Sequence, residues 1–186
     1  HSRSTRLPDG SVALGGIGCH GMALMVPELR TPAATHMGGE GANWIGMADY
    51  VDTDHIFQNM GEGTYAHSGV LAIRAAVAAG VNITYKLLFN SATAMTGGQP
   101  VEGEFTASDI IWQLHAEKVK RIILLSEFPH ARRTLPPGVR VLPRTELDTA
   151  QRELRAIPGV TALVYEQGCA AERRRLRKRQ QNPDPA

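Results

Sequence analysis

The clearest succession of apolar runs and polar turns lies between residues 57 and 100. An apolar run there leads into a glycine turn, and a segment rich in small side chains follows, with apolar residues at helical spacing. Ser68 is expected to cap this helix and Gly80 to end it. The run 82–90 is rich in β-branched and large apolar residues, which is typical of strands buried on both faces. The pattern predicts a strand, helix, strand unit with parallel strands.

The same alternation continues on both sides of this unit. Short strands are expected near 11–14 and 35–38, the latter before a short helix capped by Asn43. The second half is expected to hold helices at 106–119 and 146–157, the second capped by Thr145. Strands are expected at 121–126 and 160–166, with a further short strand after a proline turn within 136–143. This alternation predicts an α/β fold, a doubly wound and mainly parallel sheet with helices on both faces.

Length and composition fit one globular domain with a basic end. The 186 residues, 42% of them hydrophobic, suffice for one well-packed core. The net charge of +2 is uneven, because the residues from 172 onward hold six basic and two acidic side chains. We expect a domain at 1–170 and, at 171–186, a basic helical stub that runs into a disordered tail or linker. Because no aromatic residues interleave the basic run, it is interpreted as a solvated linker helix and not as a nucleic-acid site.

The cysteines and the lengths of the apolar runs indicate a compartment. Cys19 and Cys169 lie far apart in sequence, suggest no disulfide framework and fit a reducing cytoplasm. No apolar run approaches the roughly 20 residues that span a bilayer, and the first residues lack the order of a secretory signal. We expect a cytoplasmic protein without a membrane partner and, since the sequence begins at His1, a piece of a larger chain.

Two polar residues follow neighbouring strands of the predicted unit. Glu62 stands between Gly61 and Gly63 directly after the first apolar run, and Asn90 ends the second. Because parallel strands end at one edge of a sheet, where open α/β sheets bind their ligands, both are expected at that edge. Such oxygen ligands suit Mg²⁺ that holds a diphosphate. The loop after Asn90 offers further groups for phosphate oxygens, at Thr96, Gly97, Gly98 and Gln99.

Another glycine pattern favours a different ligand. Gly16, Gly18 and Gly21 satisfy G-x-G-x-x-G, which in a Rossmann fold binds a nicotinamide dinucleotide. That interpretation needs a longer strand before the loop and a helix after it, whereas Pro27 and Pro32 break any helix early. Nicotinamide binding stays an alternative.

A further glycine-rich loop and two histidines complete the candidate chemistry. Glycines on both sides of Glu40 allow close backbone approach, so a second ligand-facing loop is expected from Gly39 through Gly41 to Asn43. His20 and His67 are the candidates for proton transfer, because histidine titrates closest to neutral pH.

Several motifs together resemble one enzyme family. Gly-Glu-Gly-Thr-Tyr-Ala-His-Ser-Gly at 61–69 and Ala-Met-Thr-Gly-Gly-Gln at 94–99 are similar to the thiamine-diphosphate-binding domain of the 2-oxoacid:ferredoxin oxidoreductases. They are most similar to the indolepyruvate ferredoxin oxidoreductase branch. The likeness extends through Gly-Ile-Gly-Cys-His at 16–20, Thr-His-Met-Gly-Gly-Glu-Gly-Ala-Asn-Trp-Ile-Gly at 35–46, Pro-Gly-Val-Thr at 158–161 and Cys-Ala-Ala-Glu at 169–172, and so covers nearly the whole chain.

The resemblance also implies ligands. It implies Mg²⁺ bound by Glu62, Asn90 and the Ala92 carbonyl, although the family generally has Asp where Glu62 stands. It further implies that Cys19 and His20 line the thiamine pocket. The residues expected to bind the coenzyme are Gly18, Cys19, His20, Gly39, Glu40, Gly41, Asn43, Gly61, Gly63, Thr64, Thr96, Gly97, Gly98 and Gln99.

The reaction implied by the resemblance is an oxidative decarboxylation. A 2-oxo acid, an aryl pyruvate such as indolepyruvate, becomes an acyl-coenzyme A, and ferredoxin accepts the electrons. The carboxylate that activates the pyrimidine ring and the iron–sulfur clusters are expected in other domains or subunits, so the chain alone is expected to be inactive and to form a homo-oligomer. A non-oxidative thiamine-diphosphate-dependent decarboxylase or synthase stays an alternative.

Overall fold

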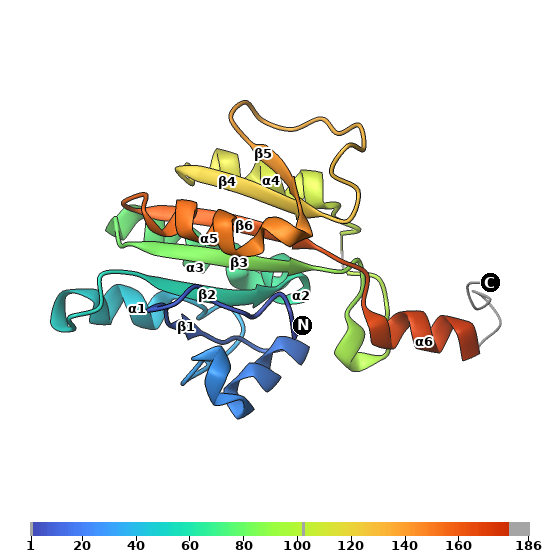
Figure 1. The fold of residues 1–186 in the computed structure, drawn as a ribbon, viewed down its shortest axis with the longest axis horizontal. Coiled ribbons are helices and arrows are strands. Elements are labelled where there is room, and N and C mark those ends of the chain that lie inside the picture. Colours follow the sequence, from blue (N-terminus) through green and yellow to red (C-terminus); the bar gives the residue numbers. More distant parts are fainter. Residues whose placement is uncertain (1, 102, 179–186) are drawn as a thin grey trace.

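The computed structural model describes residues 2–101 and 103–178 and contains one six-stranded sheet (Figure 1). All neighbouring strands are parallel, and their order is β1-β2-β3-β6-β4-β5. The strands are β1 (Ala13–Leu14), β2 (Ile56–Gly61), β3 (Ile83–Phe89), β4 (Arg121–Ser126), β5 (Arg140–Pro143) and β6 (Val160–Glu166). The predicted α/β fold with a parallel sheet is confirmed.

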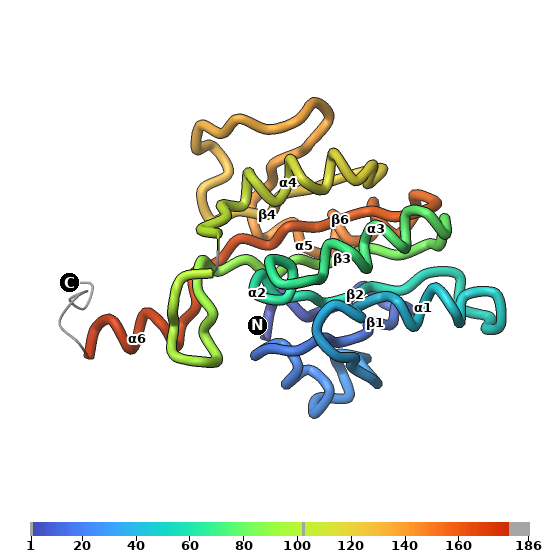
Figure 2. Tube along the Cα trace, turned by 180° about the vertical axis from the view of Figure 1, so that it is seen from behind, coloured from blue at the N-terminus to red at the C-terminus, as the bar shows by residue number. Residues whose placement is uncertain are grey.

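Helices cover both faces of the sheet, as the sequence predicts. In Figure 2, α3 and α4 lie in front of the strands and α5 lies behind them. The α-helices are α1 (Ala42–Met47), α2 (Glu62–Thr64), α3 (Val70–Ala79), α4 (Ala107–Ala116), α5 (Leu147–Arg155) and α6 (Ala170–Lys178). None of the helices in the described part of the chain is both long and apolar enough to cross a bilayer.

Two hydrophobic clusters lie against opposite faces of the central strands. Tyr85 and Leu87 of β3 join the cluster under α1, α3 and α4, whereas Leu88 joins Leu154 and Leu163 in the cluster under α5. Successive strand side chains point to opposite faces, so a strand covered on both sides has apolar residues at nearly every position. This explains why β3 and β6 have almost no exposed position.

The segment before β2 departs from the prediction. The expected strand at 35–38 is wrong: Ala34 forms only an isolated bridge with Gly15. Asn43 does not cap α1, because the N-cap is Gly41, which has a φ of 88°. The Tyr85 hydroxyl lies where a side chain at this glycine would be, so glycine is needed there for space as well as for conformation.

The helix after β2 begins earlier than expected. α2 starts at Glu62 immediately after the strand and continues through a π-helical turn, Tyr65–Gly69, into α3. The predicted cap at Ser68 is therefore wrong, whereas Gly80 ends the helix in the left-handed conformation as predicted. The π-turn adds a residue to one turn, a feature that is frequent near functional sites. Glu62 is thus part of a helix start and not of a free glycine turn.

Of the helices α4 and α5, only α4 begins with a side-chain cap. Thr106 caps α4 through a capping box with Asp109. Thr145 does not cap α5, because a 3-10 turn, Arg144–Glu146, precedes that helix and its N-cap is Glu146. The basic segment is helical as far as residue 178, and the expected disordered tail at 179–186 lies outside the described residues.

Candidate functional site

A hollow of about 200 Å³ lies at the carboxyl ends of β2 and β3. Gly61 and Leu88 are register partners on these adjacent parallel strands, so the residues that follow them meet at one edge of the sheet. Its lining comes from four segments: Ile17, Gly18, Cys19, His20, Met37, Gly61, Glu62, Gly63, Thr64, Leu88, Asn90, Ala92, Thr93, Ala94, Met95 and Thr96.

The Glu62 carboxylate fastens the loop that leaves β3. Its Oε2 accepts hydrogen bonds from the backbone N–H groups of Asn90 (2.6 Å) and Ser91 (3.1 Å), and Oε1 accepts one from Ala92 (2.7 Å). Burial raises the pKa of Glu62, whereas the three amide donors act in the opposite direction. A carboxylate has about four acceptor positions, so one position on Oε1 remains for a further donor or cation.

Asn90 carries a buried oxygen without a partner. Asn90 lines the hollow, and its Oδ1 accepts no hydrogen bond from the residues that the structure describes, while its N–H is bonded to Glu62. Unpaired buried oxygens are costly, and a cation is one group that would satisfy this atom. Asn90 Oδ1 and the remaining position on Glu62 therefore fit Mg²⁺, which takes few protein ligands when phosphates supply others.

His20 borders the hollow as a neutral base. The side chain is buried, and burial lowers its pKa to about 4, so the imidazole is uncharged at pH 7. A side chain at Gly18 would come within 3.0 Å of this ring, and one at Gly61 within 3.5 Å. His67 is exposed and does not line the hollow; its Nδ1 is hydrogen-bonded to the Ser68 hydroxyl at 2.7 Å.

The loop around Glu40 lies next to the hollow, but of this loop only Met37 lines it. Glu40 is fully buried, and its Oε2 accepts a hydrogen bond from the Gly38 N–H at 2.7 Å. Burial raises the pKa of this carboxyl, and the nearby Ile17 backbone and Thr64 hydroxyl lower it. The members of this loop that were expected to face the ligand do not line the hollow: Gly39, Glu40, Gly41 and Asn43.

The loop after Ala92 contributes only its first half. Thr96 lines the hollow, whereas Gly97, Gly98 and Gln99 do not. The Gly98 N–H already donates to the Thr93 carbonyl (3.1 Å), and Thr93 N–H donates to Gln99 (2.8 Å). These bonds close the loop on itself.

The sequence patterns did not indicate several apolar residues of the lining. Ile17, Met37 and Met95 border the hollow and are 47%, 38% and 63% exposed. Ala94, Thr93 and Leu88 complete the wall. An apolar residue between glycines gives no sign of its position, although methionine in a glycine-rich loop is a weak indication of an adaptable contact surface.

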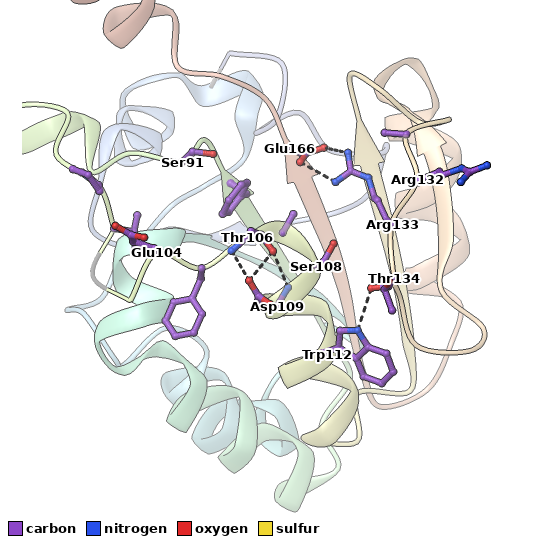
Figure 3. A pocket seen from close by; sticks show the side chains of 16 residues that line it. Ser91, Glu104, Thr106, Ser108, Asp109, Trp112, Arg132, Arg133, Thr134 and Glu166 are labelled. Atoms are coloured by element: carbon purple, nitrogen blue, oxygen red, sulfur yellow. Dashed lines mark hydrogen bonds and ion pairs between the residues drawn. The ribbon is translucent and has the colours of Figure 1, made fainter.

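A larger hollow of about 800 Å³ lies beside Ser91, between the start of α4 and the loop after β4 (Figure 3). Its charged groups are largely paired: Arg133 binds Glu166 at 2.7 Å, and Asp109 accepts from Thr106. A third hollow, of about 340 Å³, is lined by both Cys19 and Cys169, whose thiols are free. The largest of the three also has a buried nitrogen without a partner among the described residues, Arg133 Nε, but only the smallest combines such an acceptor oxygen, Asn90 Oδ1, with a carboxylate bonded to the same residue, so we take it as the best candidate for ligand chemistry.

The Rossmann alternative gains no support from the local structure. Gly16 and Gly18 lie between the two-residue β1 and a 3-10 helix, Cys19–Met25, and Gly21 lies within that helix. A dinucleotide site needs a full strand before this loop and an α-helix after it.

Comparison with solved structures identifies the fold. The chain is similar to 2-oxoglutarate:ferredoxin oxidoreductase from Magnetococcus marinus, with a TM-score of 0.65 and 16% identity over 90% of this chain and 56% of that one. It is also similar to benzoylformate decarboxylase from Polynucleobacter necessarius (TM-score 0.60, 16% identity, 89% of this chain and 32% of that one). For a putative thiamin diphosphate-dependent enzyme from Mycobacterium smegmatis the TM-score is 0.57, with 17% identity over 89% of this chain and 30% of that one.

These neighbours share the α/β architecture of this sheet, and the chain spans about half the length of the first and about a third of the other two. No family model and no curated protein matches the sequence.

Proposed function

We propose that this chain is the diphosphate- and metal-binding half of a thiamine-diphosphate-dependent enzyme that acts on 2-oxo acids. The proposal rests chiefly on one observation, the buried and unpaired Oδ1 of Asn90 beside the Glu62 carboxylate at the ends of two parallel strands. The fold shared with three enzymes, one of them described as thiamin diphosphate-dependent, supports it. So do the motifs at 61–69 and 94–99.

The chain's own residues would bind and orient the coenzyme. Asn90 Oδ1, the open position on Glu62 and the Ala92 carbonyl are the proposed Mg²⁺ ligands, and Glu62 also holds the loop that presents them. His20, which lines the hollow as a neutral imidazole at pH 7, is the proposed residue for proton transfer. The coenzyme, when bound, supplies the carbon nucleophile that reacts with a 2-oxo acid. His67 has no part in this proposal, because it is exposed outside the hollow.

The reaction type is proposed to be oxidative. The Magnetococcus neighbour is described with 2-oxoglutarate, coenzyme A and succinyl-CoA bound, which favours coenzyme A as acyl acceptor and ferredoxin as electron acceptor. Preference for aryl pyruvates rests on the motif resemblance alone. The likeness to benzoylformate decarboxylase favours a non-oxidative 2-oxo acid decarboxylase as the second candidate.

A protein partner is proposed to complete the site. At about 200 Å³ the hollow is smaller than the ~300–1,000 Å³ of ordinary ligand pockets, as expected for one wall of a shared site. Its exposed rim of Ile17, Met37 and Met95 suits cover by another domain or subunit. That partner would bring the activating carboxylate and the iron–sulfur clusters. The free thiols of Cys19 and Cys169 suit a reducing cytoplasm.

Calorimetric titration with thiamine diphosphate, with and without Mg²⁺, tests the proposal. The wild-type chain is expected to bind the coenzyme only with Mg²⁺. Asn90→Ala removes the unpaired oxygen but keeps the backbone N–H bonded to Glu62, so we expect affinity to fall at least about tenfold, the loss of one ligand interaction.

Glu62→Ala, which also releases the loop, is expected to abolish binding. Asn43→Ala is the matched control, since Asn43 lies outside the hollow. Tight binding that needs no metal and survives Asn90→Ala would contradict the metal assignment.

A further inference from the structure

Helix α6 has no buried residue, yet it contacts the loop that forms one wall of the hollow. The Arg175 guanidinium donates a hydrogen bond to the Ala94 carbonyl at 2.8 Å and forms an ion pair with Glu172 at 3.1 Å. The Glu172 carboxylate packs directly against Gly98. Figures 1 and 2 both show α6 and the loop side by side, extending away from the sheet.

The loop, residues 93–99, depends on this helix for its position. Its internal bonds join Thr93 to Gln99 and Gly98 to Thr93, and these give it a shape without fixing where it lies. Gly98 has a φ of 81°, and a side chain there would occupy the space of the Glu172 carboxylate. Helix and loop therefore fit together at a point where only glycine is accommodated.

The helix itself is held at its other side. Arg173 forms an ion pair with Glu127, just after β4, at 3.3 Å, and Glu127 also pairs with Arg144 at 3.2 Å. These contacts tie α6 to the body of the domain. Helix α6 therefore links the 93–99 loop to the end of β4 in the sheet.

We propose that Glu172 and Arg175 are positioning residues that hold the 93–99 loop where Ala94, Met95 and Thr96 wall the coenzyme site. Arg175 acts in two ways. It anchors the loop through a charge-assisted hydrogen bond, and it neutralises a carboxylate that would otherwise repel a bound diphosphate. The consequence for affinity rests on the function proposed above, whereas the consequence for loop order does not.

Hydrogen exchange and coenzyme binding, measured on the same variants of the full chain, separate the effect on loop order from the effect on coenzyme affinity. In Arg175→Ala we expect amide exchange at Thr93 and Gly98 to accelerate about tenfold, the loss of one charge-assisted bond. Affinity for thiamine diphosphate with Mg²⁺ should fall by a similar factor. Arg174→Ala is the matched control: it removes the same charge from an exposed neighbour that forms no hydrogen bond or ion pair with the described residues, and both readouts should stay within about twofold.

Two further variants guard against a general loss of structure. Gly98→Ala leaves every charge in place but displaces Glu172, so it should accelerate exchange in the loop as Arg175→Ala does. Glu172→Gln combined with Arg175→Ala should recover part of the lost affinity, because no uncompensated charge remains.

The outcomes are distinguishable. If Arg175→Ala and Arg174→Ala give equal exchange in the loop, the positioning role is overturned. If exchange rises but the wild type binds no coenzyme, the positioning role stands and the proposed function fails. If exchange rises and the wild type binds the coenzyme while affinity is unchanged by Arg175→Ala, the loop does not serve the site.

Discussion

Single buried charges in this protein are tolerated only with specific partners, and Lys86 is the extreme case. It lies fully buried in β3, its Nζ donates a hydrogen bond to the Arg6 carbonyl at 3.0 Å, and it stands 5.8 Å from the centre of the Phe57 ring. Burial lowers its pKa from 10.5 to about 7. The N-terminal segment is thus held to the sheet by a lysine whose pKa burial brings down towards neutrality.

This lysine makes stability depend on pH. Between about pH 7 and 10.5 the unfolded chain binds more protons at this position than the folded one, so the free energy of unfolding should rise with pH across that window. Urea unfolding at pH 7 and pH 9 measures the rise for the wild type. Lys86→Met, of similar length and without charge, should remove most of it. An unchanged pH dependence in this variant would show that Lys86 is not the cause.

The polar residues of the site illustrate how far a sequence specifies a single side chain. The nearness of Glu62 and Asn90 was predictable, because both follow parallel strands that end at one edge. The three amide bonds that occupy Glu62, and the missing partner of Asn90 Oδ1, were not. They depend on the path of the loop after β3, which no local pattern encodes.

At the scale of elements, boundaries follow sequence where capping chemistry is local. Gly80 ends α3 as expected, and Thr106 caps α4, since each acts within one turn. Ser68 and Thr145 look equally suitable as caps, yet the chain is already helical before each of them. In both cases tertiary packing of the preceding turn overrides the local preference.

The capping box of α4 gives a prediction at this scale. Thr106→Ala removes the acceptor for the Asp109 N–H and should lower the free energy of unfolding by about 1 kcal/mol. Thr106→Ser should restore most of it. Ser108→Ala, in the same turn, serves as the control in urea unfolding, because the Ser108 hydroxyl forms no hydrogen bond within the part of the chain that the structure describes. Equal losses in Thr106→Ala and Ser108→Ala would mean that the cap contributes nothing.

For the molecule as a whole, the two hydrophobic clusters share their strands. Leu87 and Leu88 are consecutive in β3 and belong to opposite clusters, and the same alternation recurs between Ile123 and Leu124 in β4. Neither cluster can lose its strands without exposing the other. The domain is therefore expected to unfold as one unit.

Cavity-forming mutations on the two faces of the sheet test whether the domain unfolds as one unit. Leu87→Ala, on the α3 and α4 side, and Leu163→Ala, on the α5 side, should each lower the free energy of unfolding by about 2–5 kcal/mol. Both should shift one calorimetric transition with no second peak. Two separate transitions, each sensitive to one variant only, would show that the faces fold independently.

The sequence by itself determined the parallel α/β fold, because strands buried on both faces and the helices between them leave periodic patterns in the chain. It also determined that Glu62 and Asn90 would share an edge, since strand ends in a parallel sheet coincide. Only the tertiary structure decided that Glu40, Gly98 and His67 lie outside the hollow and that α6 braces the 93–99 loop. Contacts between segments some eighty residues apart depend on how loops pack in space, and no spacing along the chain records them.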